Sequence, residues 1–182
     1  MKEVFLLNLE IILLRHGIAE NRAKDGTDYN RKLTREGKDK LKERLPHLKN
    51  LITYKDQVEI WSSPLLRAKE TAEILAESVH TDKIFYYDFI GEGDFDNFLM
   101  SVVREKEEKT IFVVGHEPYL GEWVYELTDQ SIGFKKGAAA AFTVKLYDNR
   151  TPETEDMIEE ASYSWYLTSK EMEKTEKKKD KE

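Results

Sequence analysis

The chain contains no cysteine among its 182 residues. Without thiols it can form neither a disulfide nor a zinc–thiolate site, and a cysteine nucleophile is excluded. Any covalent catalysis therefore has to use another side chain. The sequence also has no internal repeat and no low-complexity linker, so its length fits one compact domain.

The sequence also has no apolar run long enough to cross a membrane. Its longest apolar stretch, Val4 to Leu14, is interrupted by Asn8 and Glu10. No small-residue cleavage site of a signal peptide follows this stretch. We therefore expect a soluble, cytoplasmic protein without a membrane partner.

Positive charge is in the minority, with 29 Lys and Arg against 36 Asp and Glu. This balance argues against a protein that coats nucleic acid or an anionic membrane. We expect no nucleic-acid partner, although a local basic pocket is compatible with the composition. Lys135 and Lys136, beside Gly137, allow two interpretations: solvated loop charge, or a positive site that attracts an anionic substrate.

Short aliphatic runs alternate with helical patterns along most of the chain. Four strands are predicted, at residues 11–14, 58–61, 83–87 and 110–114. Four helices are predicted to follow them, beginning near Thr34, Pro64, Asp94 and Pro118, with a kink or restart of the first helix at Pro46. The alternation predicts a three-layer α/β/α sandwich with right-handed crossovers.

The last third of the chain has a different pattern. Residues 138–147 and 161–167 alternate apolar with polar side chains and are joined by the polar stretch 148–156, which predicts an antiparallel pair at one side of the sheet. Residues 170–182 are nearly all charged and show no apolar face to bury. We expect a single domain at residues 1–169 and a charged tail at residues 170–182.

Basic side chains follow three of the predicted strands. Arg15 and His16 come directly after the first strand, Arg67 lies in the first turn of the helix after the second, and His116 follows the fourth. Ligands of such sheets bind beyond the carboxyl ends of the strands. These four side chains are therefore expected to converge on one crevice, although each taken singly has an ordinary structural explanation.

Two histidines and two arginines suit phosphoryl transfer better than acyl transfer or metal-assisted hydrolysis. A phosphoryl group in transfer spreads negative charge over its oxygens, and fixed guanidinium groups stabilise that charge where Mg²⁺ would otherwise be needed. A neutral imidazole is a good nucleophile toward phosphorus, and its adduct is labile to water. A metal site on His16 and His116 is disfavoured, because the arginines would repel the ion.

Three short motifs make the chain similar to a known family. They are Leu14-Arg15-His16-Gly17, Ser63-Pro64-Leu65-Leu66-Arg67-Ala68 and Gly115-His116-Glu117-Pro118. Together they resemble the histidine phosphatase superfamily. A segment like residues 31–37 and an ending like residues 164–167 resemble its short SixA-type phosphohistidine phosphatases, and the resemblance covers roughly residues 11–167.

The resemblance implies a phosphoglycerate mutase-like fold, with a mixed, mostly parallel sheet of six strands and one antiparallel member. It implies that His16 is the phosphorylated nucleophile, that Arg15 and Arg67 grip the phosphoryl oxygens, and that His116 completes the pocket. It further implies a metal-independent hydrolase without a cofactor. Its expected substrate is phosphohistidine in a protein, such as a phosphorelay carrier.

The general acid and the substrate leave alternatives open. Superfamily members that act on phosphate esters hold an acid in a longer insertion after the third strand. Here residues 89–94 are a short connection, in which Glu92 is the acid candidate and Asp94 fits better as a helix N-cap. The short connection predicts a site open to a protein side chain.

Two alternative functions remain open. One is a small-molecule phosphomonoesterase or phosphomutase acting on a phosphorylated metabolite, and the other is a phosphate-binding or interaction domain without turnover.

Overall fold

The computed structural model of the chain describes residues 6–22, 26–147 and 157–175. Its strands are β1 (Leu6–Arg15), β2 (Val58–Ser62), β3 (Ile84–Tyr86), β4 (Lys109–Gly115), β5 (Ala139–Tyr147) and β6 (Ile158–Leu167). They form one six-stranded sheet in the order β3-β2-β4-β1-β5-β6. β5 is antiparallel to both of its neighbours, whereas the other pairs are parallel, as the resemblance implied.

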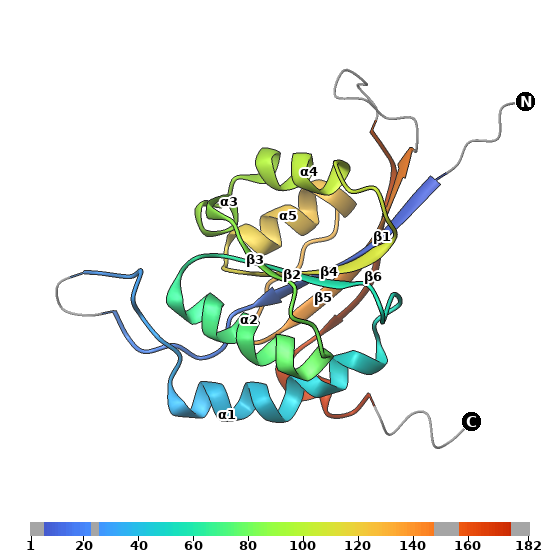
Figure 1. Cartoon of the computed structure of the whole chain (residues 1–182). Helices are drawn as coiled ribbons and strands as arrows, with labels where there is room; N and C mark the ends of the chain where they lie inside the picture. Colours follow the sequence, from blue (N-terminus) through green and yellow to red (C-terminus); the bar gives the residue numbers. More distant parts are fainter. Residues whose placement is uncertain (1–5, 23–25, 148–156, 176–182) are drawn as a thin grey trace, which may run out of the picture.

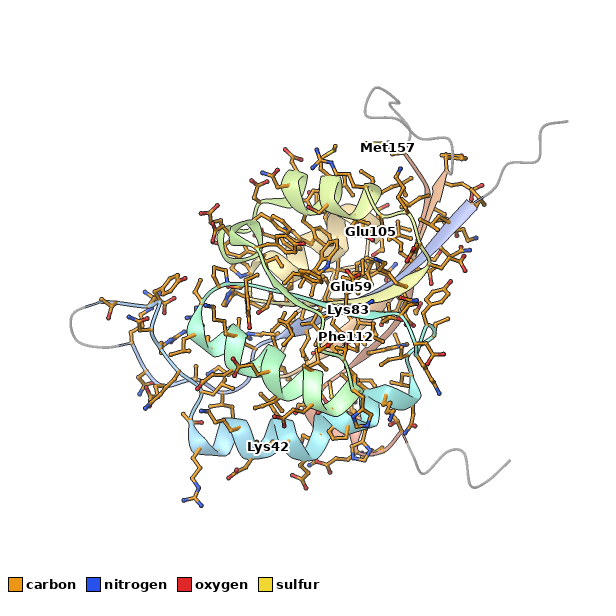
Figure 2. All side chains as sticks on the ribbon, in the orientation of Figure 1. Lys42, Glu59, Lys83, Glu105, Phe112 and Met157 are labelled. Carbon is orange, nitrogen blue, oxygen red and sulfur yellow. The ribbon has the colours of Figure 1, made fainter. Side chains whose placement is uncertain are left out.

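Helices cover both faces of the sheet (Figure 1). They are α1 (Arg35–Arg44), the 3-10 helix η1 (Leu45–Asn50), α2 (Leu66–Val79), α3 (Asp88–Glu92), α4 (Phe95–Val103), α5 (Tyr119–Thr128) and α6 (Ser169–Met172). α1, η1, α2 and α6 bury apolar side chains against one face, and α3, α4 and α5 against the other. Phe112 of β4, labelled near the centre of Figure 2, is fully buried in the first of these cores. The predicted three-layer α/β/α sandwich is confirmed.

The first helix begins as its sequence predicts. The Thr34 hydroxyl oxygen accepts a hydrogen bond from the backbone N–H of Gly37 at 2.9 Å, which satisfies one of the donors left open at a helix start. α1 ends at Arg44 and is followed by η1, which contains Pro46. Proline has no backbone N–H to donate to the next helical hydrogen bond. The buried stripe of the two helices is Leu41, Leu45 and Leu48.

Two strands begin several residues earlier than predicted. β1 begins at Leu6 rather than at residue 11, and β6 begins at Ile158 rather than at residue 161. The additional residues of β1 pair with the end of β5, where Leu6 lies opposite Tyr147. Polar residues within these segments hid them from a search for continuous or alternating apolar runs.

The connections around the second and third strands also differ from the prediction. α2 begins at Leu66, two residues after Pro64, because Leu65 is its extended N-cap. The short helix α3 was not predicted; it occupies the connection between β3 and α4. The predicted N-cap at Asp94 is confirmed, since its carboxylate accepts a hydrogen bond from the backbone N–H of Asn97 at 3.1 Å.

The beginning of the charged C-terminal stretch is anchored. Met172 is fully buried, and Glu173 forms an ion pair with Arg44 at 2.7 Å. The expectation that nothing after residue 169 is buried is therefore wrong for Met172, because one methionine among charges produces no periodic signal. The division at residue 169 stays a prediction, and residues 148–156 and 176–182 lie outside the described residues.

No helix in the described part of the chain combines the length and apolar character needed to cross a bilayer.

Candidate active site

The parallel pairing of β1 and β4 places the two histidines side by side. Arg15 lies opposite Gly115 in the register of the two strands, so His16 and His116 follow at the same level. Their ring centroids are 5.1 Å apart at an interplanar angle of 54°. Each histidine is only 5% exposed. Both lie at the carboxyl edge of the sheet, where ligands are expected to bind.

The hydrogen bonds of His16 define its tautomer. Its Nδ1 lies 2.7 Å from the carbonyl oxygen of Gly17. Because a carbonyl only accepts, Nδ1 carries the proton and the lone pair is on Nε2. Burial lowers the pKa of His16 to about 3, with further lowering by the charges of His116, Arg67 and Arg15 and a partly opposing hydrogen bond to Gly17. The ring is therefore neutral at neutral pH.

Arg67 connects the first turn of α2 with His16. Its Nε donates a hydrogen bond to His16 Nε2 at 3.3 Å, and the residue is 5% exposed. The Thr71 hydroxyl, one turn later, donates to the Arg67 carbonyl at 2.7 Å and accepts from the Gly17 N–H at 3.2 Å. The helix start and the loop after β1 are thereby fixed to each other.

Asp28 holds the outer end of the Arg67 guanidinium. Nη1 donates to the Asp28 carbonyl at 3.0 Å, and Nη2 donates to Asp28 Oδ2 at 2.8 Å. The other carboxylate oxygen lies 3.5 Å from Arg22 Nε and 3.3 Å from Arg31 Nε. Burial alone would raise the pKa of Asp28, but the charge and hydrogen bond of Arg67, with the two other arginines, lower it overall.

His116 is held by Ser63, the residue directly after β2. The His116 Nε2 and the Ser63 hydroxyl oxygen are 2.7 Å apart, and the same oxygen accepts the backbone N–H of Leu65 at 3.2 Å. Burial lowers the pKa of His116 to about 4; Arg67, Arg15 and Arg31 lower it further, whereas Asp28 opposes them. The other ring nitrogen, Nδ1, is buried and has no hydrogen-bond partner among the described residues.

Arg15 is oriented by the loop before β5. Its Nη1 donates to the carbonyl oxygen of Phe134 at 2.6 Å. That loop is itself held by Glu117, whose carboxylate accepts the backbone N–H groups of Phe134 and Gly121. The Arg15 Nε is buried without a hydrogen-bond partner in the described ranges. Two buried side-chain nitrogens, Arg15 Nε and His116 Nδ1, thus have no hydrogen-bond partner in the part of the chain that the structure describes.

Glu92 makes no hydrogen bond or ion pair with the described residues of this cluster. Glu92 is exposed at the end of α3, and no hydrogen bond or ion pair links it to another described residue. The next residue, Gly93, has a φ of 74°, and a Cβ there would lie 2.3 Å from the Tyr119 ring at the start of α5. This close packing keeps the end of α3 at the same edge of the sheet as His116.

Sequence reasoning overlooked two residues of the site. Ser63 stands inside one of the three motifs and directly follows a strand, which are signals that could have identified it. Asp28 lies in the polar loop between β1 and α1, and no sequence pattern distinguishes it from its neighbours.

Comparisons with known proteins agree with the geometry. A family model for the histidine phosphatase superfamily (branch 1) matches residues 11–96, a range that includes Arg15, His16 and Arg67. The chain belongs to the histidine phosphatase superfamily. A relative of this superfamily member, an uncharacterized protein of Picosynechococcus sp., is 35% identical over 118 residues, which are 63% of this chain and 70% of the relative.

Solved structures share the fold of this histidine phosphatase superfamily member at low sequence identity. The protein histidine phosphatase SixA in complex with tungstate has a TM-score of 0.71 and 22% identity, covering 90% of this chain and 99% of that one. A phosphoglycerate mutase of Plasmodium falciparum has a TM-score of 0.59 and 17% identity, with coverages of 90% and 92%. A mycobacterial glucosyl-3-phosphoglycerate phosphatase has a TM-score of 0.62 and 12% identity, with coverages of 88% and 99%.

Proposed function

We propose that this protein is a metal-independent phosphatase that hydrolyses phosphohistidine in a protein, through a covalent phosphohistidine on His16. The observation that carries the proposal is the state of His16. Its ring is neutral, its Nδ1 proton is held by the Gly17 carbonyl, and its Nε2 lone pair lies beside Arg67. A nucleophilic imidazole needs this arrangement, because only the unprotonated nitrogen can attack phosphorus.

In the first step, His16 Nε2 attacks the phosphorus of the substrate's phosphohistidine. The new Nε2–P bond forms as the N–P bond to the substrate imidazole breaks, and the leaving imidazole takes up a proton from solvent. The Arg67 N–H that donates to Nε2 would then turn to a phosphoryl oxygen. Such charge-assisted hydrogen bonds stabilise the negative charge of the transferring group.

In the second step, water attacks the phosphorus of the phosphorylated enzyme. The Nε2–P bond breaks, inorganic phosphate leaves, and the water proton passes to solvent or phosphate, so that His16 returns to its neutral form. The low pKa of His16 suits this return, since the ring does not retain a second proton at neutral pH.

The unpartnered donors around His16 support a phosphoryl pocket. Buried polar groups are nearly always hydrogen-bonded, and exceptions at a site point to a ligand. Arg15 Nε and His116 Nδ1 are both buried without partners in the described structure. We assign both to phosphoryl oxygens, together with Arg67, which brings two fixed positive charges and one neutral donor to the group.

Ser63 would set the tautomer of His116. The Ser63 oxygen accepts from Leu65 N–H, and its own proton has His116 Nε2 as its acceptor at 2.7 Å. The His116 proton is then on Nδ1, where it can donate to a phosphoryl oxygen while the ring stays neutral. Ser63 is a positioning residue in this scheme, acting through His116.

The substrate class follows from what surrounds the pocket. An imidazole leaving group makes less demand on a general acid than an alcohol does, and the exposed Glu92 has no hydrogen bond that holds it toward His16. The connection from β3 to α4 contains only the five-residue helix α3, which leaves room for a side chain of another protein. Both features favour phosphohistidine over a phosphate ester.

A small-molecule phosphomonoesterase or phosphomutase is the second candidate. The packing of Gly93 on Tyr119 favours it, because it keeps neighbouring Glu92 at the edge where an alcohol leaving group would depart. In that case Glu92 is the general acid, and Glu92→Gln should slow turnover of phosphate esters but not of phosphohistidine.

The proposal is tested by comparing the wild type, His16→Ala and His80→Asn on a phosphohistidine protein and a panel of phosphate esters, with chelator present. His80 is exposed, and its left-handed φ of 58° tolerates asparagine, which makes it a matched control. We expect His16→Ala to lower turnover by at least about 10³-fold. Rapid quenching in alkali should trap a phosphoenzyme in the wild type and in His80→Asn only.

The other outcomes separate the alternatives. Full turnover by His16→Ala would refute the covalent route, and loss of activity with chelator would refute metal independence. Preference for esters would favour the small-molecule enzyme, and binding of phosphate without turnover of any compound would favour a non-catalytic phosphate-binding or interaction domain.

A further inference from the structure

A basic recess of about 430 Å³ lies between α1, residues 135–137 and the start of α6. Its wall includes five basic side chains, namely Arg15, Lys40, Arg44, Lys135 and Lys136. Among the described residues that line it there is no acidic one. This contrasts with the whole chain, whose formal net charge is −7.

The five charges of the recess are not equally available. Lys40 is paired with Glu36, and Arg44 with Glu173, so these two charges are partly neutralised by carboxylates outside the wall. Lys135 and Lys136 are exposed. Within the described ranges, no carboxylate lies at ion-pair distance from either of them. The pKa of Glu171 is lowered mainly by its hydrogen bonds to Thr168, and the charge of Lys135 is the last of the causes. The charges of both lysines therefore remain largely available to an anion that enters the recess.

The recess adjoins the proposed phosphoryl pocket. The backbone N–H of Gly137 donates to the carbonyl oxygens of Arg15 and His16, at 3.1 Å each. Gly17, directly after the nucleophile, also lines the recess. An anion bound by Lys135 and Lys136 would thus be a close neighbour of the group transferred to His16.

We propose that this recess binds a second oxyanion of the substrate, distinct from the transferred phosphoryl group. In a phosphohistidine protein this oxyanion is the carboxylate of an acidic residue near the phosphohistidine. The assignment of the substrate rests on the proposed function. An acidic partner is repelled by most of this anionic chain, so a local basic recess both attracts it and fixes its orientation.

The experiment uses two phosphohistidine peptides that differ only in flanking residues, Asp in one and Asn in the other. Their KM values are measured for the wild type, for Lys135→Glu/Lys136→Glu and for the control Lys55→Glu/Lys83→Glu. The control makes the same charge change on exposed residues that precede β2 and β3, at the opposite edge of the sheet; Lys83 is labelled in Figure 2.

We expect the wild type and the control to have a lower KM for the Asp peptide than for the Asn peptide. In the recess variant this preference should shrink by about tenfold, the size expected for two exposed charge pairs. Raising the salt concentration should weaken the preference of the wild type for the Asp peptide. An unchanged preference in the recess variant, or an equal change in the control, would overturn the inference.

Binding of the unphosphorylated Asp peptide tests the recess without catalysis. In NMR titrations of the wild type we expect amide shifts at Gly37 and Gly137, and their loss in the recess variant. This result would support the recess even if no phosphohistidine were hydrolysed. Shifts that persist in the recess variant would overturn it, whatever the enzyme's substrate. A bisphosphorylated small molecule that competes with the peptide would identify phosphate as an equivalent oxyanion.

Discussion

Asp28 and Arg67 are the residue pair with the clearest consequence for catalysis. Asp28→Asn keeps the backbone acceptor for Arg67 Nη1 but removes the charge that holds Nη2. We expect kcat to fall about tenfold, the loss of one charge-assisted hydrogen bond. KM for an anionic substrate should not rise, because removing a carboxylate makes the site more positive.

A double-mutant cycle distinguishes this positioning role from a general effect on stability. Arg67→Ala alone should cost roughly 3–4 kcal/mol of transition-state stabilisation, as loss of a preorganised charge-stabilising donor does. If Asp28 acts through Arg67, Asp28→Asn has no further effect on kcat in the Arg67→Ala background. Additive losses would show that the two residues act independently.

The residues of the candidate site were predictable where the side chain itself implies chemistry. Arg15, His16 and His116 directly follow predicted strands, and Arg67 lies in the first turn of the helix after another. Their convergence was therefore expected from the position of ligands beyond the carboxyl ends of such strands. Ser63 and Asp28 contribute by holding other side chains, and such contacts depend on how two segments meet in space.

Among the contacts between secondary-structure elements, the packing of α1 on the loop after β1 sets the position of His16. Gly37 lies so close to this loop that a Cβ would be 2.2 Å from the Ile18 carbonyl oxygen. The same oxygen accepts hydrogen bonds from the backbone and side chain of Thr34, at 2.9 Å and 3.3 Å. The helix and the loop therefore cannot separate without losing these bonds.

Gly37→Ala tests this contact. Alanine favours a helix by about 1 kcal/mol over glycine, yet we expect a net loss of about 1–3 kcal/mol in unfolding free energy from overpacking. Turnover should fall too, since Ile18 is two residues from His16. Thermal unfolding and kcat should be compared with Gly133→Ala, where a Cβ meets nothing within 4 Å; equal behaviour of the two variants would disprove the contact's importance.

Among the elements, those with strong periodicity or a clear cap were predictable, such as the strand at residues 110–114 and the helix capped by Asp94. The elements that escaped prediction lack such signals. α3 has only five residues, and the first half of β1 is a strand because β5 pairs with it. Strand order likewise depends on contacts distant in the sequence.

The buried neutral histidines link the stability of the whole molecule to pH. In the unfolded chain the pKa of both histidines is near 6.5. In the folded protein the pKa is about 3 for His16 and about 4 for His116. Between about pH 4 and 6.5 the unfolded chain binds more protons. Their contribution to stability is therefore complete above pH 6.5 and is lost as the pH falls toward the folded values.

Replacing one of the two histidines should reduce by one the number of protons that the chain takes up when it unfolds in this pH range. For His116→Gln we expect the slope of unfolding free energy against pH, measured by urea denaturation between pH 4.5 and 6, to decrease by about 1.4 kcal/mol per pH unit. The variant His80→Asn, at an exposed position, is measured beside it as the control. A variant slope equal to that of the wild type would mean that His116 titrates normally in the folded protein.

The ten-residue strand β6 ends the sheet on one side, and a long outer strand is a template onto which another chain can add. The register between β5 and β6 shifts twice, at Ala141/Phe142 and at Lys145/Leu146, and such irregularities bend a border strand out of a flat, stackable shape. The exposed Glu159 adds a negative charge that two approaching copies would bring together, whereas Glu160 is paired with Lys145 at 2.7 Å. These features of the edge strand β6 oppose the addition of further copies of the chain and hence the growth of fibrils.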